Sequence, residues 1–314
     1  MTARRLAVVV PTRDRPEQLR TCLTALRAAL GPDDELIVSD SASRDRAGVA
    51  AVVEAAGGRL VRCEVKGTSR ARNAGWRATT AQEVAFVDDD VVVDASWAGA
   101  IRGRTNEEVA FVSGRTVAPA EFTGQAVSVT TGRPADVIGP HVGGDFLAAN
   151  NLLVRRDVLE AVGGFDERLG PGTWLQAGED LELLDRVREA GFSGRYVHEA
   201  LAEHEQWRDA AALRRLQWAY GKGMGARVAA ASRRSPREGW ALLPQMLRLG
   251  GLRTLWQRLP GTSRPLPEVA VANDPPPADV SGWAGPLLWR AGAWVGFLVG
   301  LGVLSPRGPR GPAL

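Results

Sequence analysis

Apolar runs and helical spacing alternate along the first 113 residues of the chain. Five short apolar runs are typical of strands, at residues 6–10, 35–39, 59–63, 84–87 and 109–113. The first four runs are nearly continuous, which is the pattern of parallel strands buried on both faces. Apolar and alanine-rich positions between the runs recur at spacings of three and four, so we expect helices at 16–30, 46–56 and 69–80. The alternation predicts a doubly wound α/β sheet, whose ligands bind beyond the carboxyl ends of the strands.

The pattern changes after residue 113. Residues 115–144 are rich in Gly, Pro and Thr, and we expect loops there with at most an irregular hairpin. The Pro-rich residues 262–282 are expected to form a linker or a strap. Between these segments the spacing predicts a strand at 145–154 and helices at 155–163, 179–190, 209–232 and 237–258.

Residues 283–304 are apolar over about 20 residues, the length of a membrane span. Pro286 and Arg290 interrupt this stretch and leave a continuous run of 14 residues at 291–304, which is short for a span. Three tryptophans and a basic tail suit the headgroup region of a membrane. We therefore expect a helix that packs on the protein or lies in a membrane interface, in preference to a span.

Composition and charge narrow the class of protein. The chain has 314 residues, of which 45% are hydrophobic and 24% charged, as in a globular protein with one large domain and appendages. The net charge is only +3, so nucleic acid is not the expected partner. Cys22 and Cys63 lack the spacing of a zinc site or a disulfide framework, and the first apolar run has five residues, too few for a signal peptide. We expect a cytoplasmic protein, peripheral at the inner face of the plasma membrane if residues 283–304 bind lipid.

The most informative motif is VAFVDDD, an apolar strand that runs directly into Asp88, Asp89 and Asp90. Three adjacent carboxylates repel one another, and alternating side chains of an extended segment share a side, so Asp88 and Asp90 can converge. Mn²⁺ or Mg²⁺ would compensate the charge and complete its shell with water and substrate phosphates. A solvated acidic turn is the alternative, but the strand delivers the cluster to the ligand edge of the sheet, which favours a metal site.

Two further strand ends carry polar groups that suit a nucleotide. The first strand ends in Pro11, Thr12 and Arg13, and the second in Asp40 and Ser41. These residues offer an acceptor and hydroxyl groups for a base or a ribose. Without the context of the sheet, ordinary turn chemistry would be the better explanation of each strand end.

The segment GTSRARNAG, residues 67–75, adds Arg70 and Asn73 at the start of a predicted helix. Backbone N–H groups and a guanidinium there could face a phosphate or a base. A helix cap formed by Ser69 is the competing interpretation.

A second acidic pair, Glu179 and Asp180, occupies the first turn of a predicted helix, where the helix dipole stabilises carboxylates. Helix capping is the alternative to a catalytic role. The preceding residues 169–178 form a loop rich in Gly and Trp, which could be a wall beside a substrate. His204, in a strand-like tail, could reach the metal as an imidazole ligand or be structural.

Taken in order, these motifs resemble the family-2 glycosyltransferases, the inverting family with the glycosyltransferase-A fold, over residues 5–225. The matching segments are VVVPTRDRPEQLRTCLTAL, IVSDSAS, GTSRARNAG, VAFVDDD, NNLLVRRDVLEAVGGFDERLGPG and GEDLELLDRVREAG. After the aspartate of IVSDSAS the family more usually has a second acidic residue or Asn. The QxxRW signature of processive synthases is absent from the sequence, which favours single transfer over polymerisation.

The resemblance implies a fold and a set of residue roles. It implies a nucleotide-binding, Rossmann-like sheet flanked by helices, with a C-terminal helical extension. Asp40 would bind the nucleotide base, with Thr12 and Arg70 beside the nucleotide. Asp88 and Asp90 would form the DxD-type site that holds Mn²⁺ or Mg²⁺ against the donor diphosphate.

The resemblance also implies the catalytic groups. Asp180 would be the general base that deprotonates the acceptor hydroxyl, with Glu179 adjacent. His204 and Arg186 stand where many members carry a histidine and an arginine. Asp145, Asn150, Trp174 and Arg186 are candidates for acceptor or sugar contacts.

We therefore expect an inverting, metal-dependent hexosyl- or deoxyhexosyl-transferase that uses a nucleotide-diphosphate sugar. The acceptor would be a hydroxyl of a glycan, a lipid-linked or a small molecule, in cell-wall, glycan, glycolipid or natural-product assembly. A sugar-1-phosphate nucleotidyltransferase is an alternative, but that class expects a GxGxR-like loop where this chain has PTRDRP. A non-catalytic, membrane-associated subunit of a polysaccharide assembly system is another, which the two acidic clusters disfavour.

The expected organisation follows the motifs. It comprises a catalytic domain at 1–205, a helical region at 206–259, a Pro-rich linker at 260–282, an apolar helix at 283–304 and a basic tail at 305–314.

Overall fold

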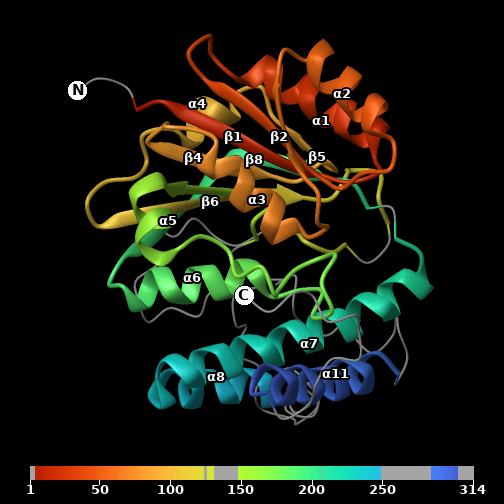
Figure 1. Ribbon diagram of the computed structural model, residues 1–314, viewed down its shortest axis with the longest axis vertical. Coiled ribbons are helices and arrows are strands. Elements are labelled where there is room, and N and C mark those ends of the chain that lie inside the picture. Colours follow the sequence, from red (N-terminus) through yellow and green to blue (C-terminus); the bar gives the residue numbers. More distant parts are fainter. Residues whose placement is uncertain (1–3, 124–125, 131–147, 207, 249–283, 303–314) are drawn as a thin grey trace. The chain divides into compact units, whose positions relative to one another are not determined.

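The computed structural model describes residues 4–123, 126–130, 148–206, 208–248 and 284–302 (Figure 1). The chain divides into two compact units. The sheet unit contains the described residues up to Glu167 and those from Asp180 to Gln206. The helical unit contains residues 168–179 and the described residues from Arg208 onward.

The sheet unit is built on an eight-stranded mixed sheet with the strand order β3-β2-β1-β4-β7-β6-β8-β5. Its strands are β1 (Leu6–Thr12), β2 (Glu35–Ser41), β3 (Arg59–Cys63), β4 (Glu83–Val87), β5 (Val91–Val93), β6 (Val109–Val117), β7 (Asn151–Arg155) and β8 (Ser193–His204). Strands β1 to β4 are mutually parallel, as the continuous apolar runs predicted. Strand β7 is antiparallel to both β4 and β6, so the second half of the sheet is mixed.

Helices cover both faces of this sheet. They are α1 (Pro16–Ala29), α2 (Arg46–Ala55), α3 (Thr68–Arg77), α4 (Trp97–Ile101), α5 (Arg156–Val162) and α6 (Glu179–Glu189). Leu6, Val8 and Val10 of β1 join the core under α1, α2 and α4, whereas Ala7 and Val9 join the core under α3, α5 and α6. Because both faces are buried, each strand needs apolar residues at consecutive positions.

Helix α3 lies very close to the sheet, and this closeness depends on Gly75. A Cβ atom at Gly75 would come within 2.3 Å of the Val9 side chain and 2.6 Å of the Ser39 hydroxyl. Helix α3 also begins at the carboxyl ends of β2 and β3, through the short link of residues 64–67. The missing side chain at Gly75 therefore lets α3 pack closely on β1 and β2, while the short link places the first turn of α3 at the edge of the sheet where ligands are expected.

The described part of the helical unit contains the loop at residues 169–178 and the helices α7 (Ala210–Arg234), α8 (Pro236–Arg248) and α11 (Ala284–Gly300). Asp209 caps α7, since its Oδ1 accepts a hydrogen bond of 2.6 Å from the Ala212 amide. Met224 and Val228 of α7 pack with Trp289 and Ala293 of α11. Among the helices of the described residues, none combines the length and the apolar character that crossing a membrane requires.

Most predicted elements are present, with differences at the margins. The three-residue strand β5 and the short helix α4 were not predicted, and β6 continues to Val117, into the stretch expected to be loop. Helix α3 has Gly67 at its N-cap, so Ser69 is not the cap. The Pro-rich residues 262–282 lie outside the described residues, and the expected division into five segments stays a prediction.

Candidate active site

The candidate site begins where β1, β2 and β4 end. Thr12 is the last residue of β1 and pairs in register with Asp40 of β2. Asp88 follows the last residue of β4 directly. The sheet therefore brings together the ends of three parallel strands, as the sequence predicted.

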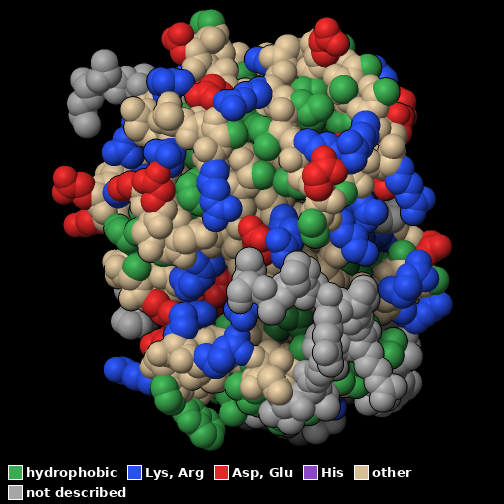
Figure 2. Space-filling view, in the orientation of Figure 1, with side chains coloured by type: hydrophobic (Ala, Val, Ile, Leu, Met, Phe, Trp, Pro, Cys, Tyr) green, Lys and Arg blue, Asp and Glu red, His purple; other side chains and the backbone are tan. Residues whose placement is uncertain are grey.

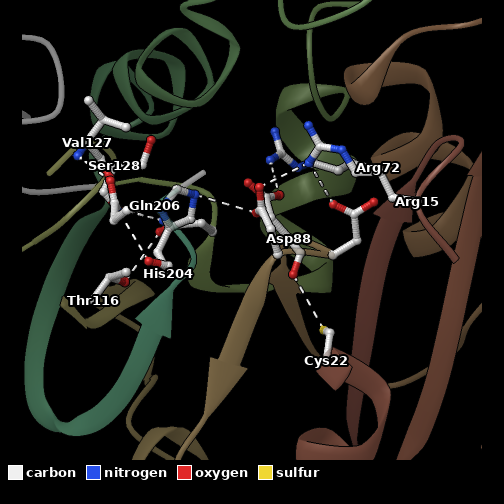
Figure 3. A network of polar contacts seen from close by, with 12 residues as sticks. Arg15, Cys22, Arg72, Asp88, Thr116, Val127, Ser128, His204 and Gln206 are labelled. Carbon is white, nitrogen blue, oxygen red and sulfur yellow. Dashed lines mark hydrogen bonds and ion pairs between the residues drawn. The ribbon is translucent and has the colours of Figure 1, made fainter. Parts of the chain in front are cut away.

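Asp88, Asp89 and Asp90 form a turn, which we call the acidic turn. The Val91 amide donates a hydrogen bond of 3.2 Å back to the Asp88 carbonyl, so the segment is not extended, contrary to the expectation from the sequence. The Arg15 guanidinium donates to Asp90 Oδ2 at 3.0 Å and to Asp89 Oδ1 at 3.3 Å (Figure 3). The Arg15 guanidinium thus bridges the carboxylates of Asp89 and Asp90.

Two further side chains hold the acidic turn in place. The Thr12 hydroxyl donates a hydrogen bond of 2.7 Å to Asp89 Oδ2. The buried Cys22 thiol lies 3.5 Å from the Asp88 carbonyl oxygen (Figure 3). Thr12 was predicted to lie beside the nucleotide, and the structure gives it a fixed place under the turn.

Arg72 is the cation that meets Asp88. Its Nη2 donates to Asp88 Oδ1 at 2.7 Å (Figure 3), and its guanidinium lies 5.4 Å from the centre of the Phe165 ring. The side chain is only 3% exposed. Sequence reasoning singled out Arg70 and missed both Arg72 and Arg15.

A signal for Arg72 was present in the sequence. The buried face of α3 carries Ser69, Arg72, Asn73 and Trp76, at the spacings of three and four that define one face of a helix. Arg70 falls off this face and is half-exposed, in an ion pair of 2.6 Å with Glu167. Helical spacing therefore separates an inward from an outward arginine within the same motif.

The acidic turn carries more negative charge than its two arginines balance. Burial and the adjacent charge of Asp90 raise the pKa of Asp89 to about 7, although Arg15 and Thr12 favour its ionised form. Closely spaced carboxylate oxygens short of positive charge are the donor set that Mg²⁺ and Mn²⁺ prefer. Among the described residues, no three acidic, His or Cys side chains are arranged as a complete metal site, so a metal here would need further ligands such as substrate phosphates.

His204 lies beside the acidic turn, with Nε2 3.5 Å from Asp90 Oδ1. Its other ring nitrogen, Nδ1, is 2.8 Å from the Gln206 side-chain nitrogen (Figure 3). The orientation of the Gln206 amide is set by Val127, whose N–H donates to Oε1 at 2.9 Å and whose carbonyl accepts from Nε2 at 3.0 Å. His204 Nδ1 therefore faces an N–H group and must accept.

The protonation of His204 follows from this contact. With Nδ1 accepting, a neutral imidazole carries its proton on Nε2, directed toward Asp90. A metal-bound Nε2 needs that lone pair free. In this arrangement the Nε2 proton points toward Asp90 Oδ1, 3.5 Å away, and the role of His204 as a metal ligand stays a prediction. Gln206 and Val127 had not been predicted to take part.

Asp180 opens α6. Its Oδ1 accepts a hydrogen bond of 2.8 Å from the Leu181 amide, and its Oδ2 lies 3.4 Å from the Ala149 amide. Burial raises the pKa of Asp180, and the positive charge of Arg72 acts in the opposite direction. Arg72 therefore acts on both carboxylate groups of the site, Asp88 and Asp180.

The expected nucleotide side has a fixed arrangement. Asp40 is buried and accepts hydrogen bonds from the Arg62 guanidinium and from the Ser43 amide. The Ser41 hydroxyl accepts a hydrogen bond of 2.8 Å from the Gly67 amide and so fixes the residue that precedes α3. Arg62, which pairs with Asp40, had not been predicted to take part.

Several predicted site residues have structural partners. The Asn73 amide exchanges hydrogen bonds of 2.9 Å with the Phe165 backbone in both directions. The Arg186 guanidinium binds the Glu182 carboxylate and the Gly164 carbonyl. The Asn150 side-chain amide donates a hydrogen bond of 2.8 Å to the Ser128 carbonyl. These contacts join segments within the sheet unit, and ligand contacts of these residues stay predictions.

The other predicted residues have the following placements. Pro11 is buried in β1, and Arg13 Nε lies 3.6 Å from Asp14 Oδ2. Glu179 is buried at the start of α6, and Trp174 is half-exposed in the helical unit. Asp145 lies outside the described residues.

An α/β sheet with an acidic turn after β4 and a further carboxylate at the start of α6 defines the glycosyltransferase-A class. Residues 7–162 match the family described as Glycosyl transferase family 2. The chain belongs to this family, as its motifs predicted.

Curated relatives and solved structures agree with this assignment. The chain is 29% identical over 218 residues to a pre-mycofactocin glycosyltransferase of Mycobacterium tuberculosis, a match that covers 64% of this chain and 43% of the relative. It is 26% identical over 238 residues to the glycosyltransferase AglE of Haloferax volcanii, a match that covers 69% of this chain and 72% of AglE. The chain thus spans less than half the length of the mycobacterial relative.

The solved structures share the fold. A mannosyltransferase of Pyrobaculum calidifontis, PcManGT, superposes with a TM-score of 0.58 at 18% identity and covers 95% of this chain and 88% of its own. TarS of S. aureus superposes with a TM-score of 0.53 at 14% identity, and the match covers 95% of this chain and 55% of the TarS chain. At these identities the likeness establishes the glycosyltransferase-A fold.

Proposed function

We propose that the protein is an inverting, metal-dependent glycosyltransferase. It moves a hexosyl or deoxyhexosyl group from a nucleotide-diphosphate sugar to an acceptor hydroxyl, one sugar per acceptor. The observation that carries this proposal is that one buried cation, Arg72, acts on both the acidic turn and Asp180. Donor binding and proton removal are then assigned to two carboxylate groups within the same unit.

The nature of the donor is supported by the solved relatives. PcManGT was solved in complex with GDP-Man and Mn²⁺. Residues 1–349 of TarS, which superpose with a TM-score of 0.50 at 14% identity, were solved in complex with UDP. A nucleoside diphosphate is common to both complexes, and we assign a donor of this class to the present chain.

Asp88 and Asp90 are the residues we assign to Mn²⁺ or Mg²⁺, with Asp89 between them. The pKa of Asp89, raised to about 7 by burial and by Asp90, marks a shortage of positive charge that a divalent cation corrects. When bound, the metal neutralises the leaving diphosphate. His204 supports this site by donating its Nε2 proton toward Asp90.

Asp180 is the general base of the proposed reaction. Its carboxylate removes the proton of the acceptor hydroxyl while the hydroxyl oxygen forms a bond to the anomeric carbon of the donor. The bond from that carbon to the diphosphate breaks, and its electron pair leaves with the diphosphate. A single displacement inverts the anomeric centre. Burial raises the pKa of Asp180 and thereby makes the ionised carboxylate a stronger base.

The nucleotide and the acceptor have their own assigned residues. Asp40 is placed at the base, with Thr12 and Arg70 beside the nucleotide. Arg62 holds the Asp40 carboxylate and therefore fixes the acceptor atoms that a base would meet. Trp174 is assigned to the acceptor.

The proposal is tested with UDP- and GDP-sugars in the presence of Mn²⁺ or Mg²⁺. The expected result is metal-dependent release of UDP or GDP from one class of donor, with a transferred sugar of inverted configuration by ¹H NMR. Release that is unchanged by a chelator would contradict the metal assignment. A retained configuration would contradict the single displacement, and absence of both nucleotide release and nucleotide binding would contradict the function.

A further inference from the structure

Lys222 is a buried lysine in a chain that almost always uses arginine. The sequence holds 39 basic residues, of which only Lys66 and Lys222 are lysines. Lys66 is exposed, whereas Lys222 lies on α7 with 5% of its surface exposed. An ammonium group is a compact point charge with three donors, and a planar guanidinium does not reproduce its contacts. A buried cation also needs partners that replace water.

Among the described residues, the partners of the Lys222 ammonium group belong to the loop at residues 169–178. Its Nζ donates a hydrogen bond of 2.7 Å to the Trp174 carbonyl and one of 2.8 Å to Gln176 Oε1. The same Nζ lies 4.8 Å from the centre of the Trp174 ring, within the range of a cation–π contact. Lys222 therefore binds this loop through its backbone, through one side chain and through its aromatic ring.

The backbone of the loop has conformations that need such support. Gln176 has φ 65°, in the left-handed region that residues other than glycine rarely adopt, and its side chain is one of those that Lys222 binds. The Thr173 hydroxyl donates to the Gly170 carbonyl at 2.8 Å and accepts from the Gln176 amide at 3.1 Å. Sparsely populated backbone conformations persist where surrounding contacts determine them, and here those contacts include Lys222.

The loop also lies directly on the backbone of α7, next to Lys222. A Cβ atom at Gly223 would come within 2.6 Å of the Ala177 carbonyl carbon, and one at Gly178 would come within 2.8 Å of the Gly223 carbonyl oxygen. Both positions exclude any side chain. With Ala177 buried and Trp174 38% exposed, the loop is anchored at one end of its sequence and offers an aromatic ring in its middle.

We infer that Lys222 is a positioning residue that fixes this loop, so that the Trp174 ring forms a platform for a sugar ring of the acceptor. The inference rests on the proposed function and extends it to the class of acceptor. A pyranose ring presents a face of C–H groups that packs on an indole, while its hydroxyls meet the polar groups around it. A ring that is already held loses little conformational freedom when it binds a ligand. Two residues after the loop ends, the chain reaches Asp180.

Binding to Trp174 can be measured directly. The protein is labelled with 5-fluorotryptophan, and Trp174→Phe assigns the Trp174 ¹⁹F resonance among the ten tryptophans. A panel of p-nitrophenyl hexosides and deoxyhexosides is then added. The expected result is a shift of the Trp174 resonance with at least one glycoside. Trp240, which is 72% exposed on α8, serves as the matched control and should not shift. If no glycoside moves the Trp174 resonance, or if Trp240 moves equally, the inference is overturned.

The role of Lys222 is tested with Lys222→Met, Lys222→Arg and Gln176→Ala. The dissociation constant of the bound glycoside should rise about tenfold in Lys222→Met and less in the other two variants. Arg214→Met removes an exposed cation from the same helix and should leave the constant unchanged. Gln176→Ala keeps the buried lysine, so it remains informative if Lys222→Met does not fold. Unchanged glycoside affinity in folded Lys222→Met and in Gln176→Ala would overturn the positioning role.

Nucleotide release separates this inference from the proposed function. Hydrolysis of the donor by water needs no acceptor, so Lys222→Met should keep the KM for the nucleotide sugar in that reaction. An equal loss of donor and acceptor affinity would mean that Lys222 acts only on folding and would overturn the inference. Wild-type protein that binds glycosides at Trp174 but never releases UDP or GDP would retain the platform and refute the proposed function.

Discussion

The two carboxylate groups of the site differ in how their charge is balanced. In the acidic turn, Arg15 forms ion pairs with Asp89 and Asp90, and Arg72 forms one with Asp88. Among the described residues, Asp180 has no direct ion pair of this kind: the longer-range charge of Arg72 and hydrogen bonds from the Leu181 and Ala149 amides oppose the burial that raises its pKa. The acidic turn is therefore suited to holding positive charge, and Asp180 is suited to accepting a proton.

On the face that Figure 2 shows, the surface charge does not reveal this difference. Figure 2 shows basic and acidic side chains interspersed on the visible face. The net charge of +3 averages many arginines against the acidic residues. The functional charge is local and buried, and the following substitutions act on the acidic turn and its neighbours, on Asp180, or on both.

Asp180→Asn is expected to have the largest effect. An amide keeps the shape of the side chain but cannot take a proton, so kcat for transfer should fall by roughly 10³-fold or more. Nucleotide affinity should stay unchanged, since the proposed metal site lies in the acidic turn. Asp157→Asn, on the exposed surface of α5, is a matched control that should keep full activity. A residual rate above one tenth would exclude Asp180 as the base.

The pH dependence of stability tests the acidic turn. Between the unfolded pKa of Asp89, near 3.8, and its folded value of about 7, the folded protein binds a proton that the unfolded chain lacks. The free energy of unfolding of the metal-free protein should therefore decrease as pH rises through this range, by up to about 4 kcal/mol from this group. Urea unfolding of wild type and Asp89→Asn at several pH values measures the difference in their free energies of unfolding. The pH dependence of this difference is the contribution of Asp89. A difference that does not change with pH would contradict the raised pKa.

Arg72→Met should affect both the acidic turn and Asp180. Loss of the cation removes an ion pair from Asp88 and lets burial raise the pKa of Asp180 further. The rate at neutral pH should drop about tenfold, and the acid limb of the pH–rate profile should move to higher pH. Arg70→Met, on the outward side of α3, should leave the position of that limb unchanged. A drop in rate with no movement of the limb would limit Arg72 to the acidic turn.

Gln206→Glu should have the smallest effect on the folded structure. A carboxylate at this position accepts where the amide donates, so the His204 proton should move from Nε2 to Nδ1. The ¹⁵N chemical shifts of His204 in the metal-free protein report the tautomer directly. Gln206→Leu removes the contact without replacing it and is the control. A wild-type tautomer with the proton on Nδ1 would contradict the assigned orientation.

The sequence predicted the elements and the strand ends better than the side-chain network. Continuous apolar runs identified β1 to β4 because strands covered on both faces need apolar residues at every position. The extended form expected for Asp88–Asp90 was wrong, since a single hydrogen bond from Val91 to Asp88 decides between strand and turn. Among the described strands, β5 pairs with β8 alone, more than 100 residues away, and its three residues give no periodicity.

The residues that were missed share one physical feature. Arg15, Arg62 and Gln206 reach their partners through long side chains, whose direction depends on packing and not on local pattern. Gln206 meets Val127 across 79 residues of sequence. Arg72 is the exception, because helical spacing along α3 already placed it inward beside Asn73 and Trp76.

Nucleotide binding by three forms of the protein tests directly whether the acidic turn binds the donor and Asp180 removes the proton. Thermal unfolding is followed with UDP and GDP, with and without Mn²⁺, for wild type, Asp180→Asn and Asp90→Ala. A ligand that binds only the folded protein raises the melting temperature. We expect equal, Mn²⁺-dependent increases for wild type and Asp180→Asn, and little or no increase for Asp90→Ala. An increase kept by Asp90→Ala and lost by Asp180→Asn would contradict the division of roles between the acidic turn and Asp180.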